Sequence, residues 1–199
     1  PVAPARSNLQ QIERAARRAA DLCKQMLAYS GRGRFMIEPI NLSELVEEMA
    51  HMLQVSVSKK AVLKYNFAAS LPLFEGDATQ VRQVVMNLIT NASDALEERS
   101  GVISISTGAM DCDASYLHDN SLSMELPEGR YVYMEVSDSG SGMDEQTRRR
   151  IFEPFFTTKF TGRGLGLAAV LGIVRGHKGA IKVYSEPGQG TTFKVLFPA

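Results

Sequence analysis

The stretch "NLITNASDAL", from Asn87 to Leu96, combines two patterns on one predicted helix. Apolar side chains recur at helical spacing and predict a core-facing stripe: Val84, Val85, Leu88, Ile89, Ala92 and Leu96. Asn87 and Asn91 are four residues apart, so they share one face of that helix. Amide oxygens are neutral, hard ligands that suit Mg²⁺. Taken alone, the pair also fits ordinary polar surface residues, which is the more common situation.

A second stretch, "DSGSGM" from Asp138 to Met143, follows a predicted strand. A carboxylate at the end of a strand can accept a hydrogen bond from the exocyclic amine of adenine, whereas guanine presents a carbonyl there and would be repelled. Gly140 and Gly142 allow the backbone to approach a flat base closely. An ordinary Asp-Gly turn explains the same residues equally well.

The third stretch is "IFEPFFTTKFTGRGLGLAAV", from Ile151 to Val170. In a simple loop its aromatic side chains would form exposed apolar surface, so they favour a segment docked on a cleft or a partner: Phe152, Phe155 and Phe156. Lys159 and Arg163 can reach phosphate oxygens. Gly164 to Leu167 place backbone N–H groups at the start of a predicted helix, where the helix dipole favours anions.

These three features occur in one chain direction, which is far less expected by chance than any one of them. Together they resemble the ATP-binding domain of sensor histidine kinases, in the gyrase–Hsp90–kinase–MutL (GHKL, Bergerat-fold) superfamily. "NLITNASDAL" resembles its N box, "DSGSGM" its first glycine box, "IFEPFFTTK" its F box and "GRGLGL" its second glycine box. "PGQGTTFKVLFP" resembles the closing strands, so the resemblance covers about residues 35–199. The wording "NASDAL" and "FEPFFTTK" is closest to the nitrogen-regulator-like branch.

The expected fold class is α+β, a two-layer α/β sandwich with helices on one face of a mostly antiparallel sheet, over residues 34–199. Asn41 with Glu44, and Asp77 with Gln80, predict two helix starts. Residues 111–130 are polar and predict a loop.

Residues 1–33 predict a helix with a small, Ala-rich apolar stripe. The pattern leaves open whether this helix packs against partner helices or against its own domain. The resemblance makes it the second helix of a dimerisation and histidine-phosphotransfer (DHp) hairpin, which is the only part of that region in this chain.

The resemblance implies that Asp138 selects adenine, that Asn91 and Asn87 hold Mg²⁺, and that Lys159 acts on the phosphates. The implied nucleotide-binding residues are Asn91, Asp138, Gly140, Gly142, Phe155, Thr158, Lys159, Arg163, Gly164, Leu165, Gly166, Leu167 and Thr192. Other branches often carry Lys where this chain has Asp94, so Lys159 and Arg163 are expected to supply the positive charge.

ATP-hydrolysing relatives carry a glutamate at the position of Asn87 as the base for water. An amide cannot take that proton, so the resemblance implies slow hydrolysis and transfer of the γ-phosphoryl group to an imidazole. The acceptor is expected on a helix outside this chain, because His51 and His177 fit structural roles and His118 lies in the predicted loop.

Three alternatives remain at this point. They are an ATPase of the gyrase, Hsp90 or MutL type, which needs a carboxylate at position 87, a degenerate ATP-binding or dimerisation module without kinase activity, and a protein serine kinase of the same superfamily. The expected partners are a second copy of the parent chain, through the DHp helices, and the receiver domain of a response regulator.

The amino-acid composition argues against two further classes of function, nucleic-acid binding and membrane contact. Lys plus Arg and Asp plus Glu each total 22, giving zero net charge, which argues against nucleic-acid binding by phosphate neutralisation and against a polybasic membrane contact. Cys23 and Cys112 have no CxxC spacing and suggest free thiols in a reducing, cytoplasmic compartment. No signal peptide or apolar run of about 20 residues is present. The first residue is Pro1 rather than Met, so we expect a fragment of a longer parent.

Overall fold

The computed structural model describes residues 8, 12–13, 36–54, 57–58, 60–97, 99–118, 126–159 and 164–199. The helix predicted within residues 1–33 and Arg163 lie outside these ranges, apart from three isolated positions of the helix. In chain order the elements are β1 (Glu38–Ile40), α2 (Leu42–Leu53), β2 (Ala61–Asn66), β3 (Phe74–Gly76), α3 (Ala78–Ala95), β4 (Gly101–Cys112), α4 (Ala114–His118), β5 (Gly129–Asp138), α5 (Glu145–Arg150), α6 (Gly166–Gly176), β6 (Ala180–Glu186) and β7 (Gly190–Pro198).

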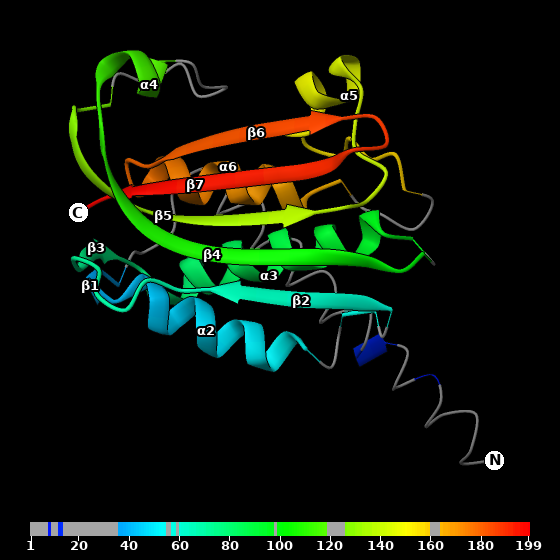
Figure 1. Ribbon diagram of the computed structural model, residues 1–199, viewed down its shortest axis with the longest axis horizontal. Coiled ribbons are helices and arrows are strands. Elements are labelled where there is room, and N and C mark those ends of the chain that lie inside the picture. Colours follow the sequence, from blue (N-terminus) through cyan, green and yellow to red (C-terminus); the bar gives the residue numbers. More distant parts are fainter. Residues whose placement is uncertain are drawn as a thin grey trace.

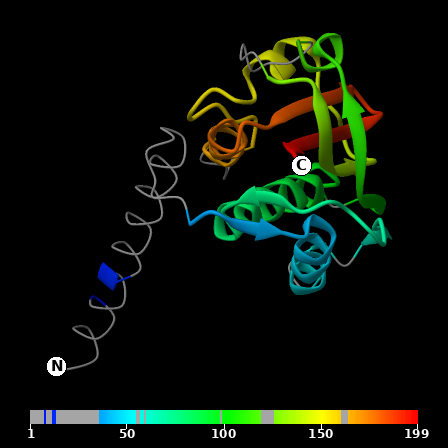
Figure 2. The ribbon, with the colours of Figure 1, turned by 90° about the vertical axis from the view of Figure 1, so that its left-hand side faces the viewer.

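Five strands form the main sheet in the order β2-β4-β5-β7-β6, and β1 pairs with β3 in a separate two-stranded ladder. The β2–β4 pair is parallel, whereas the other three pairs of the main sheet are antiparallel. Helices α2, α3 and α6 lie on one side of this sheet, as the two perpendicular views show (Figures 1 and 2). The predicted two-layer α/β sandwich is therefore confirmed.

The core lies between the sheet and α3. The apolar stripe predicted on α3 is buried, and on β5 the alternating residues Val132, Met134 and Val136 are buried as well. Each such side chain contributes roughly 1.5 to 3 kcal/mol when it leaves water. Alternation along a strand sends the residues between them to the opposite face of the sheet. Hence one face of β5 and β7 packs on helices, and the other carries polar side chains such as Ser137 and Thr192.

The prediction of a loop over residues 111–130 is wrong in part. Strand β4 continues to Cys112, α4 follows it, and β5 begins at Gly129. Cys112, Leu117 and Tyr131 are buried in a second, smaller apolar cluster. Polar residues flank this cluster and hide its pattern in the sequence. The short strand β3 was not predicted either, because three residues are too few to show a period.

His177 links the end of α6 to the start of α3. The Asp77 carboxylate caps α3 by accepting from the backbone N–H groups of Thr79 and Gln80. The backbone N–H of Asp77 donates in turn to His177 Nε2 at 2.9 Å. The other ring nitrogen, Nδ1, therefore carries the proton and donates to the carbonyl of Ile173 at 2.8 Å. His177 is only 6% exposed, so the expectation of a structural histidine agrees with the structure.

Replacing His177 with Ala should destabilise the domain by about 2 to 4 kcal/mol, because it leaves a buried N–H unpaired and opens a cavity. Urea unfolding monitored by circular dichroism measures this change. His51 is exposed on α2, and His51→Ala should stay within about 0.5 kcal/mol of the original chain. Equal losses in the two variants would contradict the linking role of His177.

Candidate functional site

A cavity of about 520 Å³ opens between α3, the end of β5, the segment before α6, and the start of β7. Most of the residues predicted to bind a nucleotide line it: Asn91, Asp138, Gly142, Thr158, Lys159, Gly164, Leu165, Gly166 and Leu167. They come from segments up to 76 positions apart in the sequence, from Asn91 to Leu167. The fold therefore gathers the separate motifs around one space.

Asp138 is the buried charge of this cavity. It ends β5, is 7% exposed, and pairs in register with Thr191 of β7. Its Oδ1 accepts a hydrogen bond from the backbone N–H of Gly140 at 2.8 Å. Burial raises the pKa of this carboxyl, while the backbone N–H groups of Gly140 and Thr191 and the charge of Lys159 lower it in part. The result is a fixed hydrogen-bond acceptor on a cavity wall.

The loop after Asp138 is held against the turn between β6 and β7 by direct backbone contact. A Cβ at Gly142 would lie 1.9 Å from the carbonyl oxygen of Glu186, and a Cβ at Gly190 would lie 1.9 Å from that of Asp138. Both glycines have positive φ, 64° and 84°. The backbone N–H of Gly188 also donates to the Ser141 carbonyl at 2.7 Å. We call this contact the glycine joint.

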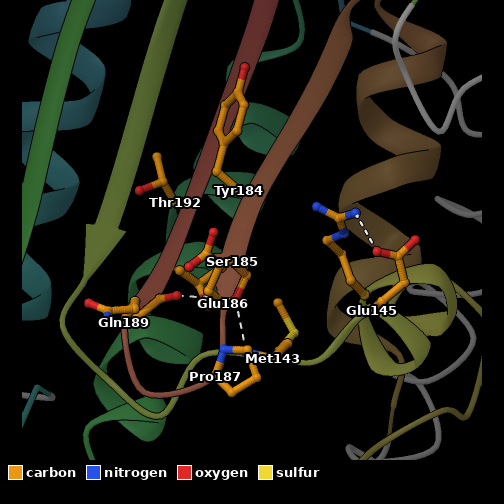
Figure 3. Close-up of a pocket in the computed structure, with 11 residues that line it drawn as sticks. Met143, Glu145, Tyr184, Ser185, Glu186, Pro187, Gln189 and Thr192 are labelled. Atoms are coloured by element: carbon orange, nitrogen blue, oxygen red, sulfur yellow. Dashed lines mark hydrogen bonds and ion pairs between the residues drawn. The ribbon is translucent and has the colours of Figure 1, made fainter.

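Ser185 adds a side chain to the glycine joint. Its hydroxyl accepts from the backbone N–H of Met143 at 2.9 Å and donates to the carbonyl of Gly190 at 3.1 Å. Figure 3 shows Ser185 and Met143 side by side next to the turn. The joint therefore fixes the backbone of the Asp-Gly loop independently of any ligand.

Thr192 does not line the cavity that contains Asp138, so it lies apart from the other residues predicted to bind the nucleotide. Thr192 lies in a second hollow beside Tyr184, together with Glu145 and the β6–β7 turn (Figure 3). Its hydroxyl is 2.8 Å from that of Ser137 on the neighbouring strand. Because side chains alternate along β7, the preceding residue, Thr191, faces Asp138 and lines the main cavity.

Asn91 and Asn87 share a helix face, but their side chains have different hydrogen-bond partners. Asn91 lines the cavity, and its Oδ1 accepts from Lys159 Nζ at 3.1 Å. Lys159 also pairs with Asp94 at 2.9 Å. Asn87 does not line the cavity. Its amide nitrogen donates instead to the carbonyl of Gly166 at 3.3 Å, which ties α3 to the start of α6.

The start of α6 forms one end of the cavity. Leu165 is the N-cap and has no side-chain capping hydrogen bond, so the N–H groups of the first turn face the cavity end without a side-chain acceptor. Gly164 has φ of 65°, and a Cβ there would lie 2.4 Å from the backbone of Phe155. Glycine at this position lets the preceding segment pass close to the helix start.

Two other predicted residues act behind the cavity wall rather than on it. Phe155 is 60% exposed and does not line the cavity, whereas Phe156 does. The backbone of Phe155 has a positive φ of 68°. Gly140 packs against α3, where a Cβ would lie 2.5 Å from the carbonyl oxygen of Ala95, and its N–H orients Asp138.

Comparison with known families identifies this arrangement. Residues 76–199 match the model of the family described as histidine kinase-, DNA gyrase B-, and HSP90-like ATPase. The chain belongs to this family. The match begins at β3 and includes all the residues found around the cavity. The resemblance inferred from the four motifs is confirmed.

Several curated relatives are sensor kinases. The chain is 37% identical over 197 residues to the sensor kinase CckA of Brucella abortus, covering 98% of this chain and 20% of that protein. It is 32% identical over 188 residues to the sensory histidine kinase/phosphatase NtrB of Azospirillum brasilense, covering 92% of this chain and 44% of that protein. The chain thus spans less than half of either relative, and it corresponds to their catalytic portion.

Two solved structures of histidine kinases have a similar fold. The catalytic domain of the histidine kinase ThkA superposes with a TM-score of 0.63 at 28% identity, covering 83% of this chain and 96% of that one. Full-length ShkA in complex with AMPPNP gives a TM-score of 0.72 at 25% identity, covering 97% of this chain and 38% of that one. Among the described residues, no helix is long and apolar enough to cross a membrane.

A divalent cation fits this site only together with a phosphate-bearing ligand. Within the described ranges, no group of three or more His, Cys, Asp or Glu side chains is placed to hold a metal. Mg²⁺ often takes one or two protein oxygens and completes its shell with water and phosphate. Asn91 Oδ1 is such an oxygen, and it already attracts a cation, the ammonium of Lys159.

Two glycine substitutions test the glycine joint. Gly190→Ala should destabilise the domain by more than about 3 kcal/mol, because steric overlap adds to the strain of a positive φ. Gly188 also has positive φ, 78°, but no atom lies within 4 Å of the position that a Cβ would take, so Gly188→Ala should cost only about 1 to 2 kcal/mol. Chemical denaturation of both variants checks the difference, and similar costs would argue against the joint.

Proposed function

We propose that the cavity binds Mg·ATP and that the domain transfers its γ-phosphoryl group to a histidine outside this chain. The observation that carries the proposal is the set of groups that line one cavity. A buried carboxylate acceptor, a helix N-terminus, a lysine and an amide oxygen all line it. This set suits a ligand that carries both a base and phosphates.

The adenine end is built from Asp138 and the glycine joint. The Asp138 carboxylate accepts from the exocyclic amine of adenine, and the backbone of Gly142 borders the flat base. Thr191 faces Asp138 from β7 and completes this wall. Guanine presents a carbonyl oxygen to the carboxylate, so the site discriminates against it through repulsion of two acceptors.

The phosphate end uses the first turn of α6 and Lys159. Backbone N–H groups from Gly164 to Leu167 face the phosphates, supported by the helix dipole. Asn91 Oδ1 would hold Mg²⁺, which would supply positive charge that neutralises the phosphates during transfer. Lys159 binds the phosphates, and the family pattern assigns the same role to Arg163. The domain's contribution to the reaction is positioning and charge neutralisation.

Asn87 accounts for transfer rather than hydrolysis. Its side chain is an amide engaged with Gly166, so it offers no base to activate a water molecule. We infer that Asn87 positions the start of α6 against α3 instead of binding the metal. Water at the γ-phosphate therefore reacts slowly, and an imidazole nucleophile needs no such base.

His177 and His51 do not suit the acceptor role. His177 is buried with both ring nitrogens hydrogen-bonded, and His51 lies on α2 and is followed by Met52 rather than an acidic residue. His118 is the last residue of the short helix α4 rather than part of a loop. On the family resemblance, we place the acceptor on a DHp helix of the parent protein, which would act as a homodimer. Residues 1–33 would supply the second helix of that hairpin, and a response-regulator receiver domain would take the phosphoryl group onward.

Asp138→Asn should weaken ATP binding about 10-fold to 100-fold, because the amide loses the charge-assisted hydrogen bond to the adenine amine. Isothermal titration calorimetry with Mg·ATP and Mg·GTP measures both affinity and selectivity. Thr192→Val is the matched control, since Thr192 lies in the other hollow, and its affinity should stay unchanged. Unchanged ATP affinity in Asp138→Asn would remove the base-binding role.

The ionisation of Asp138 predicts a pH dependence of ATP affinity in the original chain. Because burial raises the pKa of Asp138, its carboxylate should gain a proton at a higher pH than an ordinary aspartate when the pH is lowered. ATP affinity should fall as this proton is gained. A pKa that is higher in the folded than in the unfolded state means that the ionised carboxylate lowers the free energy of unfolding at high pH. This loss of stability disappears as the pH falls from the folded-state pKa to the unfolded-state pKa. Asp138→Asn should therefore fold at neutral pH and lose its share of the pH dependence.

The decisive experiment for the reaction is phosphotransfer. The chain is mixed with Mg·[γ-³²P]ATP, with and without a separate protein that carries the first DHp helix of a related kinase. We expect no acid-labile label on this chain alone and label on the added helix. Strong labelling of this chain at His51 or His118 would overturn the assignment of the acceptor, and rapid ATP turnover without any acceptor would favour an ATPase.

A further inference from the structure

The side chain of Lys159 lies on two oxygens of α3. Its Nζ is 3.1 Å from Asn91 Oδ1 and 2.9 Å from Asp94 Oδ2. Asn91 and Asp94 are three residues apart on the helix and are therefore neighbours on its surface. We call these two oxygens the cation seat. Both residues line the nucleotide cavity, as does Lys159.

We propose that Asp94 is a positioning residue of the nucleotide site, with a different cation partner before and after Mg·ATP binds. Before binding, Asp94 holds the ammonium of Lys159 at the cation seat. After binding, Mg²⁺ takes Asn91 Oδ1, Lys159 moves to the phosphates, and Asp94 accepts a hydrogen bond from a metal-bound water. The inference rests on the proposed function, in which Asn91 binds the metal.

The proposed exchange of Lys159 for Mg²⁺ follows from how close the two cations would lie at the cation seat. An ammonium and a divalent cation on one amide oxygen lie close enough to repel each other, so binding of the metal favours departure of the ammonium. Mg²⁺ retains several of its waters in protein sites. Asp94 lies beside Asn91, so its carboxylate can receive a proton donor from that water shell. The triphosphate in the same cavity supplies new anionic partners for the displaced ammonium.

The exposure of the pair makes the exchange feasible. The Lys159 side chain is 39% exposed and that of Asp94 is 59% exposed, so solvent screens their attraction. Such pairs contribute little net stability and separate readily. Of the other carboxylates that line the cavity, Asp138 is buried and Glu97 pairs with Arg99 at 3.5 Å. Asp94 is therefore the carboxylate that holds Lys159.

Binding of a non-hydrolysable ATP analogue, measured by calorimetry with and without Mg²⁺, tests this inference. Without metal, Asp94→Asn should tighten binding about twofold to fivefold, because Lys159 is released and a negative charge beside the phosphates is gone. With Mg²⁺, the variant should bind about twofold to fivefold more weakly, because the metal-bound water exchanges a charged acceptor for a neutral amide oxygen. The affinity gain from Mg²⁺ should therefore fall roughly tenfold.

Glu97→Gln is the matched control. Glu97 lines the same cavity and its carboxylate pairs with Arg99 at 3.5 Å, so the substitution removes an equal charge without touching the cation seat. Its affinity gain from Mg²⁺ should stay within about twofold of the original chain. An equal fall in Glu97→Gln would reduce the effect to general electrostatics and overturn the proposal, and so would an unchanged gain in Asp94→Asn.

The calorimetry distinguishes a failure of the proposed function from a failure of the role proposed for Asp94. If the original chain does not bind the analogue in Mg²⁺ while remaining folded, the proposed function fails. If the original chain binds and its affinity rises with Mg²⁺, but Asp94→Asn shows the same rise, only the role of Asp94 fails. Thermal unfolding of each variant confirms folding, and the exposed position of Asp94 predicts little change.

Discussion

Direct backbone contact between two loops sets the geometry of the adenine end. At the glycine joint, a side chain on Gly142 or Gly190 would overlap the carbonyl of Glu186 or Asp138. The end of β5 can therefore lie against the β6–β7 turn only because neither residue has a Cβ. The joint lies directly after Asp138, which pairs with Thr191 and is buried.

The parts of the fold that could be predicted from sequence are those set by local interactions. Asn41 and Asp77 cap α2 and α3 as their spacing indicated, since a cap involves residues only two or three positions apart. The apolar stripe of α3 is likewise a property of one helix. The ordered motifs around Asp138 and Asn91 then identified the cavity, because each motif keeps its backbone role within a short segment.

The predicted residues that do not line the cavity are positioned by interactions that no short segment of sequence contains. Whether Thr191 or Thr192 faces Asp138 is decided by the register of β7 against β5, and a shift of one residue reverses every side chain. Phe155 has a positive φ and is exposed, which its sequence neighbours do not indicate. Asn87 and Asn91 share a helix face, yet the approach of α6 occupies the first and leaves the second to the cavity.

The two ends of the cavity differ in how their charges are held, and the difference follows from what each end must do. In the proposed function, adenine is chemically unchanged by phosphoryl transfer, so a partner for it can be buried and rigid, as the Asp138 side chain is. The phosphates lose a group and change charge, so their partners must rearrange. A buried ion pair would resist that rearrangement, because separating it in low dielectric is costly. Exposed Lys159 and Asp94 can exchange partners at small cost, which suits a site that binds one phosphate state and releases another.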